Sequence, residues 1–200
     1  MLPDALRTEL SAVPGLRLLT QPEELERFSR DAYDYSPVLQ QRLAHCRAEL
    51  VVRPDTVEAV VGVASACRRH RVPLTLRGSG TGNYGQSVPL ESGVVMVMTQ
   101  LRAVRSIDPL SGVAVAECGC LLKDLNRELA GFDRQLRLMP STWRSATIGG
   151  FIAGGSGGIG SVRWGFLRDP GHLLGLEVVT MEPEPRVLQL EASDAEALNH

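Results

Sequence analysis

The sequence predicts an α+β fold with two lobes, a small parallel lobe followed by a mostly antiparallel lobe that also carries helices. A strand, a helix and a strand follow one another between residues 50 and 76, which is the order of a parallel βαβ unit. After residue 91, short apolar runs separated by turn residues are typical of antiparallel strands. We therefore expect a helical segment over residues 1–45, a first lobe over about 46–90 and a second lobe over 91–200.

The N-terminal half is expected to hold two short helices, a buried strand, a longer helix and a second strand. In chain order these are residues 4–11, 22–30, 50–52, 55–71 and 74–76. The longer helix begins with Asp55 three residues before Glu58, a spacing similar to a capping box, and Pro73 follows its end. Residues 33–46 show no regular pattern.

The C-terminal half is expected to hold five short strands and a helix. The strands are residues 94–98, 104–107, 113–117, 173–181 and 186–190. The helix places Leu121, Leu122, Leu125 and Leu129 at helical spacing. Residues 108–112 form a turn between the second and third strands because they contain Asp, Pro, Ser and Gly. A last helix is expected to begin near Asp194.

The composition is that of an ordinary globular domain, with 44% hydrophobic and 22% charged residues among 200. A net charge of -2 and an aromatic content of 4% argue against a nucleic-acid partner. No run approaches the ~20 apolar residues of a transmembrane segment, and no signal peptide is visible. The four cysteines form no CxxC pair, so we expect no metal site, reduced thiols and a cytoplasmic location.

Glycine is concentrated in two windows: four of the 20 glycines lie between Gly78 and Gly85, and eight between Gly149 and Gly165. Such density is typical of backbone that approaches a ligand closely. The first window follows the second strand of the βαβ unit, where successive N–H groups can surround a pyrophosphate. It matches G-x-G-x-x-G, but the proline and glycine that follow exclude the helix of a Rossmann motif. We therefore expect a phosphate site in a different fold.

The second window, residues 140–158, alternates glycine with small and hydroxyl residues. Such a segment can run along a flat ligand, or it can be a tightly packed crossing of a helix and a sheet. Gly154-x-Ser156-x-Gly158 also has the spacing of a hydrolase nucleophile elbow. Its flanking residues make a poor strand and a poor helix, so a hydrolase is the weaker interpretation.

Together the windows resemble the PCMH-type FAD-binding domain of the vanillyl-alcohol oxidase family, above all the glycolate oxidase large subunit and FAD-linked D-lactate dehydrogenases. Pro73 to Gln86 is similar to P-x-x-x-R-G-x-G-T-G-x-x-G-G, with Gln86 replacing the last glycine. Ala146 to Gly158 is similar to A-T-I-G-G-x-x-A-x-x-x-G-G, and residues 163–179 resemble the R-Y-G-x-x-R-D-x-V-L-G-L-E-V-V that follows. The resemblance covers roughly residues 30–190 and implies a two-lobed FAD-binding fold.

The resemblance implies that FAD lies between the lobes. It assigns Gly78 to Gly82 to the pyrophosphate, and the second window to the flavin and ribityl chain. The full set of cofactor-binding residues that it implies is Arg77, Gly78, Ser79, Gly80, Thr81, Gly82, Asn83, Ser141, Thr147, Ile148, Gly149, Gly150, Gly154, Gly157 and Gly158. Members that bind flavin covalently carry histidine at the position of Thr81, so the resemblance implies noncovalent FAD.

For the intact protein, the resemblance implies an oxidoreductase that acts on the CH–OH group of a 2-hydroxy acid such as glycolate or D-lactate. The family's flavin domain continues beyond the length of this chain, and a substrate domain follows it. We therefore expect a C-terminally truncated chain that lacks the substrate domain and needs a partner subunit or the missing C-terminal domain. No catalytic residue can be named. The alternative is a catalytically inactive FAD-binding fragment, or one subunit of a split enzyme.

Overall fold

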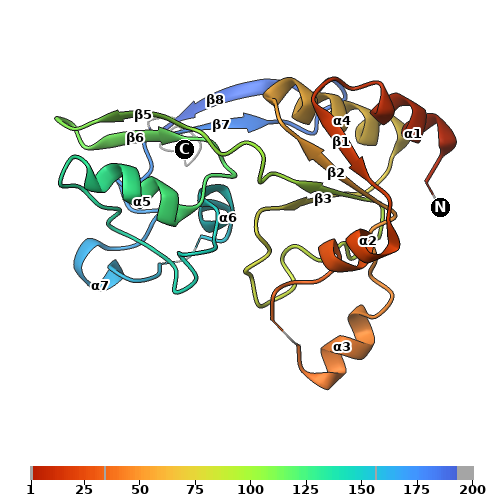
Figure 1. The fold of residues 1–200 in the computed structure, drawn as a ribbon, viewed down its shortest axis with the longest axis horizontal. Helices are drawn as coiled ribbons and strands as arrows, with labels where there is room; N and C mark the ends of the chain where they lie inside the picture. The colour runs from red at the N-terminus through yellow and green to blue at the C-terminus, as the bar shows by residue number, and fades with distance from the viewer. Residues whose placement is uncertain (1, 34, 156, 193–200) are drawn as a thin grey trace, which may run out of the picture.

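The computed structural model of the chain describes residues 2–33, 35–155 and 157–192. Two lobes lie side by side (Figure 1). The first contains a four-stranded sheet with helices on both faces. The second contains two antiparallel hairpins, a longer helix and two short ones. The predicted α+β class and its two lobes are confirmed.

The sheet of the first lobe has the order β1-β2-β4-β3. Its strands are β1 (Leu16–Leu19), β2 (Leu50–Pro54), β3 (Leu74–Arg77) and β4 (Val94–Val97). Strands β2 and β3 both pair in parallel with β4, whereas β1 pairs antiparallel with β2. The parallel relation of the βαβ strands is therefore confirmed, although β4 lies between them.

The position of strand β4 differs from the one that the sequence predicts for it. The sequence predicts that the second lobe begins at residue 91, yet Val94–Val97 is fully buried in the centre of the first sheet. A run of four apolar residues fits a central parallel strand, since both of its faces are covered. The expectation that this strand joins the antiparallel lobe was wrong, and the first lobe extends to Val97.

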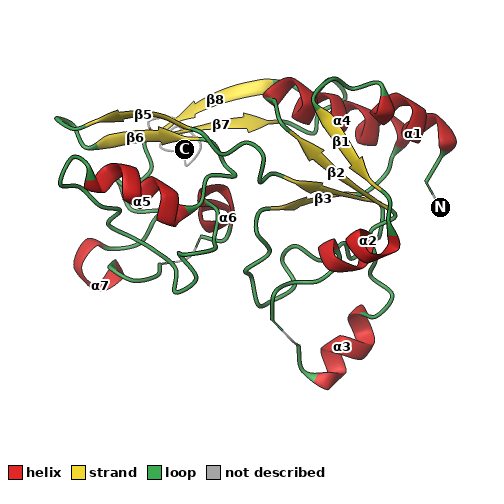
Figure 2. Cartoon of the chain, in the orientation of Figure 1, coloured by secondary structure: helices red, strands yellow, loops and turns green. Residues whose placement is uncertain are grey.

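Helices cover both faces of this sheet (Figure 2). α1 (Asp4–Ser11) and α4 (Val57–His70) lie on one face, where Leu6 and Leu10 pack against buried residues of α4, β2 and β4. α2 (Pro22–Phe28) lies on the other face, where Phe28 packs against a second buried cluster. The helices expected at residues 4–11, 22–30 and 55–71 are therefore present.

Three local expectations were wrong in the first lobe. Residues 33–46 are not wholly irregular, because α3 (Pro37–Leu43) begins after Ser36, whose hydroxyl accepts from the Leu39 N–H. The N-cap of α4 is Thr56 and not Asp55, since the Thr56 hydroxyl accepts from the Ala59 N–H at 3.1 Å. The segment 1–45 is not a separate helical piece, because it supplies β1 and α1 to the sheet and its core.

The second lobe begins with a hairpin of β5 (Val104–Asp108) and β6 (Val113–Ala116), and the Gly112 N–H donates to the Asp108 carbonyl across the predicted turn. The elements that follow are α5 (Leu122–Ala130), α6 (Ile148–Ala153), α7 (Ser161–Trp164), β7 (Gly175–Val179) and β8 (Val187–Glu191). Strands β7 and β8 form a second antiparallel pair. The mostly antiparallel lobe is therefore confirmed, while the helix expected near Asp194 lies outside the described residues.

We predict that Leu10→Ala destabilises the chain by about 2–5 kcal/mol, because Leu10 is fully buried between α1 and the rest of the core. Urea unfolding followed by circular dichroism measures this free energy. Leu110→Ala is the matched control, since Leu110 is 94% exposed in the β5–β6 turn and its loss should change stability by less than about 0.5 kcal/mol. Equal, small effects would mean that α1 is an appendage of the fold.

Candidate functional site

The first glycine window forms a loop, residues 78–86, that leaves β3 and lies between the sheet and α6 (Figure 1). We call it the glycine loop. Within the described part of the chain, the N–H groups of residues 79–83 donate no hydrogen bond. Gly80 has φ +70°, and a Cβ there would overlap the Arg77 guanidinium. The loop therefore presents a run of unengaged donors, in a conformation that requires glycine at residue 80.

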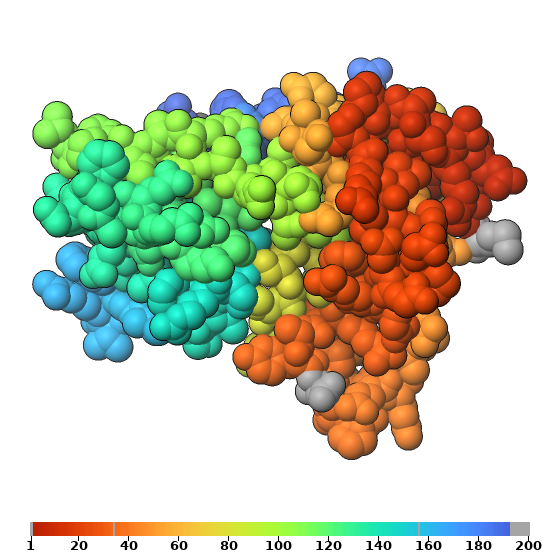
Figure 3. Space-filling model, viewed as in Figure 1, coloured from red at the N-terminus to blue at the C-terminus, as the bar shows by residue number. Residues whose placement is uncertain are grey.

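The two glycine windows meet at Gly78 and Thr147. A Cβ on Gly78 would overlap Thr147 Oγ1, and Thr147 is buried. In Figure 3 the yellow segment around residue 80 lies between the red and orange N-terminal part and the cyan atoms of the second lobe. Contact this close brings the two predicted parts of the site side by side, although some 70 residues separate them in sequence.

The second window is helical where it meets the glycine loop. Thr147 is the N-cap of α6, and its hydroxyl accepts from the Gly150 N–H at 3.3 Å. The Ile148 and Gly149 N–H groups donate to the carbonyls of Cys120 and Cys118, both at 2.8 Å. These N–H groups are engaged within the chain, so this segment contributes shape to the site and the glycine loop contributes the open donors.

The remaining predicted residues of the second window have neighbours outside the glycine loop. Gly154 caps the end of α6, and a Cβ on Gly157 would lie 3.0 Å from the Phe166 ring. A Cβ on Gly158 would overlap the Met139 carbonyl, and Met139 also pairs with Ile159. Ser141 is exposed in the turn before α6. The structure therefore brings Gly78 of the first window against Thr147 of the second, and among the described residues it gives no hydrogen bond between the glycine loop and Ser141, Gly157 or Gly158.

Arg77 lies beneath the glycine loop and is only 6% exposed. Its Nη1 donates to Ser87 Oγ at 3.0 Å, and the Ser87 hydroxyl donates to Asp31 Oδ1. The guanidinium also lies over the Phe28 ring, 5.9 Å from the centroid. Arg77 was predicted as a cofactor-binding residue, and its position is that of a support beneath the loop.

Burial and charge act against each other at Arg77. Burial lowers the pKa of Arg77, and the Asp31 carboxylate opposes that shift. Nearby, burial and then the Asp31 carboxylate raise the pKa of Tyr35 to about 12, so this phenol stays neutral at physiological pH. The site therefore keeps one buried arginine and one buried carboxylate facing each other, with the ion pair at 3.9 Å.

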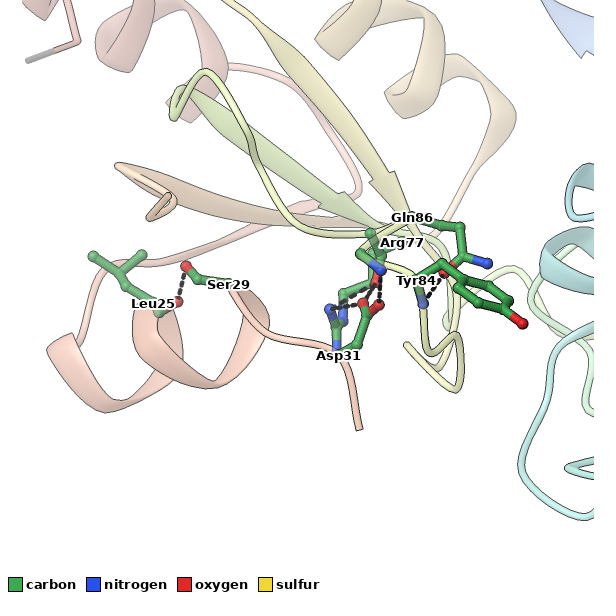
Figure 4. Close-up of polar contacts among 8 residues, drawn as sticks. Leu25, Ser29, Asp31, Arg77, Tyr84 and Gln86 are labelled. Atoms are coloured by element: carbon green, nitrogen blue, oxygen red, sulfur yellow. Dashed lines mark hydrogen bonds and ion pairs between the residues drawn. The ribbon is translucent and has the colours of Figure 1, made fainter. Parts of the chain in front are cut away.

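Sequence reasoning missed Asp31, Ser87 and the role of Gln86. Asp31 Oδ2 accepts from the Gly85 N–H, and Gln86 Oε1 accepts from the Tyr84 N–H, both at 3.0 Å (Figure 4). In the sequence, Gln86 stands out only as a departure from a usual glycine. No local pattern marks Asp31, because its partners are more than 50 residues away in sequence.

The glycine loop suits an anionic ligand with a phosphate group. Its open N–H groups can donate to phosphate oxygens, and the arginine beneath it adds positive potential. The residues present therefore fit the FAD pyrophosphate that the resemblance implies. The nucleophile elbow is not supported, since the residues before position 156 form helix α6 and not a strand; Ser156 itself lies outside the described residues.

Metal ligation and membrane spanning find no support in the described part of the chain. Among those residues, no cluster of three or more His, Cys, Asp or Glu side chains is arranged to hold a metal ion. Over the same residues, no helix has the length and apolar character that crossing a membrane requires.

We predict that Gly78→Ala destabilises the chain by about 1–3 kcal/mol, because the added methyl group overlaps the buried Thr147 side chain. Thr147→Ala should cost about 1 kcal/mol through the lost cap of α6. In the Thr147→Ala background, Gly78→Ala should then cost much less. Urea unfolding of the four proteins of this double-mutant cycle measures the coupling. Identical costs in both backgrounds would contradict the close contact.

Relatives of known function match most of the chain. Glycolate oxidase subunit GlcD of Escherichia coli (strain K12) is 31% identical over 202 residues, which cover 97% of this chain and 38% of that protein. Mitochondrial D-2-hydroxyglutarate dehydrogenase of Rattus norvegicus is 32% identical over 167 residues (84% and 29%). D-lactate dehydrogenase of Archaeoglobus fulgidus is 32% identical over 153 residues (74% and 33%). The chain therefore spans between 29% and 38% of the length of these three relatives.

Solved structures show the same fold. An alkyldihydroxyacetonephosphate synthase superposes with a TM-score of 0.78 at 21% identity, covering 96% of this chain and 39% of that one. A BBE-like 1 protein of Physcomitrella patens gives 0.75 at 20% identity, covering 94% and 38%. A family model described as FAD binding domain matches residues 48–188, which include both glycine windows. The chain therefore belongs to the family of FAD binding domains.

Proposed function

We propose that this chain is the FAD-binding part of an oxidoreductase that oxidises a 2-hydroxy acid such as glycolate or D-lactate. The observation that carries the proposal is the junction of the two glycine windows at Gly78 and Thr147, beside a loop with open N–H donors. Similarity to glycolate oxidase subunit GlcD over 97% of the chain supports the same assignment.

The two glycine windows would bind different parts of FAD. The N–H groups of the glycine loop would bind the pyrophosphate, while Arg77 supports the loop from below. The surface formed by Thr147 to Gly150 at the start of α6 would lie along the flavin, where Gly149 and Gly150 carry no side chain and Ile148 packs against the buried clusters of the second lobe. The backbone donors of this second segment are engaged within the chain, so its role is to shape the site.

When bound, FAD supplies the redox chemistry by accepting a hydride equivalent from the α-carbon of the hydroxy acid. The chain's own residues bind the cofactor, orient it and exclude water on one side. The named relatives are a glycolate oxidase subunit, a D-2-hydroxyglutarate dehydrogenase and a D-lactate dehydrogenase. These names support a 2-hydroxy acid as the substrate class for the intact protein.

The chain offers no clear base for deprotonating a hydroxy acid among the described residues. The His172 ring nitrogen Nε2 lies 2.7 Å from the Trp164 carbonyl, and His70 is bound to Glu9 between α1 and α4. These two imidazoles are therefore engaged in structural contacts. The proposal is that the base and the rest of the substrate pocket come from a partner subunit or a further domain. The alternative is a catalytically inactive FAD-binding fragment, or one subunit of a split enzyme.

We predict that the FAD is noncovalent. Threonine occupies position 81. Members of the family that the sequence resembles carry histidine there when they bind flavin covalently. Burial raises the pKa of the Cys118 and Cys120 thiols, which keeps them protonated and poorly nucleophilic. Acid precipitation of FAD-loaded protein should leave the yellow flavin in the supernatant. Flavin that stays in the pellet after washing would contradict the prediction.

We also predict that this chain alone oxidises glycolate or D-lactate poorly. Loss of a general base costs ~10²–10⁴-fold in rate, and loss of substrate positioning costs more. The assay is reduction of an artificial acceptor dye by FAD-loaded chain, with a full-length glycolate oxidase as the positive control. Turnover near ~1 s⁻¹, the lower end for ordinary enzymes, would show that these 200 residues hold a complete site.

A further inference from the structure

The segment that follows α2, residues 29–32, is joined to the glycine loop by hydrogen bonds from both backbone and side chains. The Ala32 N–H donates to the Gly80 carbonyl at 2.9 Å. The Asp31 carboxylate accepts from the Gly85 N–H and from the Ser87 hydroxyl. The glycine loop is therefore held at Gly80 and at its C-terminal end by one short piece of chain that lies far away in sequence.

This segment is itself anchored. The Ser29 hydroxyl donates to the Leu25 carbonyl at 2.6 Å in the last turn of α2 (Figure 4). It also accepts from the Ala48 N–H at 2.8 Å, just before β2. Ser29 is buried, so these bonds are shielded from water. The anchor fixes the backbone two residues before Asp31, and it thereby fixes where the carboxylate meets the loop.

Asp31 cannot itself touch a bound ligand, because its side chain is fully buried. Its carboxylate faces the Gly85 N–H, the Ser87 hydroxyl and, at 3.9 Å, the Arg77 guanidinium. The Tyr35 phenol also lies near enough for the carboxylate to raise its pKa. The Ser87 hydroxyl connects the two charges, since it accepts from Arg77 and donates to Asp31. Arg77 in turn lies where a Cβ on Gly80 would be. A chain of contacts therefore leads from Asp31 to the centre of the loop.

We infer that Asp31 is a positioning residue for the cofactor: with Ser87 and Arg77 it holds the glycine loop in the conformation whose open N–H groups bind the pyrophosphate. The inference rests on the proposed function. We call Asp31, Ser87 and Arg77 the clamp. The clamp acts on the conformation of the glycine loop. It fixes the Gly80 carbonyl toward residue 32 and the Gly85 N–H toward Asp31, which leaves the N–H groups of residues 79–83 unengaged. Asp31 lies outside residues 48–188, the range matched by the family model.

The test compares Asp31→Asn with Glu9→Gln. Asparagine keeps the size of the side chain, but its amide nitrogen meets donors and Arg77 loses its counter-charge. Glu9→Gln is the matched control, since it makes the same carboxylate-to-amide change at an interhelical contact with Arg69 and His70. Two quantities are measured on the full chain: the FAD dissociation constant by flavin fluorescence, and hydrogen exchange of the Gly85 amide without FAD.

Asp31→Asn should weaken FAD binding by about 10–100-fold, as loss of an outer contact does at other pre-organised sites. Exchange of the Gly85 amide should rise at least ~10-fold while amides of α4 keep their protection. Glu9→Gln should change both quantities by less than about twofold. Ser87→Ala keeps both charges and should weaken FAD binding about 10-fold, so it tests the clamp if Asp31→Asn does not fold.

The outcomes separate this inference from the proposed function. A wild-type chain that does not bind FAD would overturn the proposed function, and this inference with it. A wild-type chain that binds FAD while Asp31→Asn binds it equally well would overturn the inference alone. The inference also fails if Glu9→Gln weakens FAD binding as much as Asp31→Asn, because the effect would then be one of general stability.

Discussion

The close approach of Gly78 to Thr147 is the constraint on which the site depends. At that point the Gly78 backbone of the first lobe lies so near the Thr147 side chain of the second lobe that a Cβ on residue 78 would overlap Thr147 Oγ1. Thr147 cannot withdraw, because its hydroxyl caps α6 and its side chain is buried. Gly78 cannot withdraw either, since it directly follows β3, which is fixed by pairing with β4. Packing of the Gly78 backbone against one hydroxyl group therefore holds the two glycine windows together, and the glycine loop lies beside that junction.

A second layer of structure supports the loop with charge. Burying a single arginine is costly, and the Asp31 carboxylate with the Ser87 hydroxyl offsets this cost. The arrangement places the Arg77 guanidinium against the centre of the loop at Gly80, and among the described residues the N–H groups of residues 79–83 donate no hydrogen bond. An anionic ligand thus meets directional donors, while the Arg77–Asp31 pair holds the loop that carries them.

Much of the fold could be predicted from the sequence, because the apolar runs of β2, β3 and α4 have clear periods and clear turn residues at their ends. What failed depended on tertiary contacts. Val94–Val97 has the pattern of a strand, but nothing local says which sheet it joins. α6 contains two glycines, which disfavour a helix, and it forms because Thr147 caps it and the carbonyls of Cys118 and Cys120 accept its first N–H groups. In the site, the glycine windows were visible as composition, whereas Asp31 was invisible because an isolated Asp carries no pattern.

The order of strands in the first sheet also bears on how the chain folds as it is synthesised. β2 and β3 have no hydrogen bonds to one another, and each is joined to the sheet through β4, which comes last in sequence and takes the central place. A growing chain that ends before Val97 therefore holds a strand, a helix and a strand with nothing to pair the two strands in parallel. Until β4 leaves the ribosome, the backbone N–H and C=O groups that β2 and β3 direct toward it lack their native partners, and such unpaired edges are prone to aggregation.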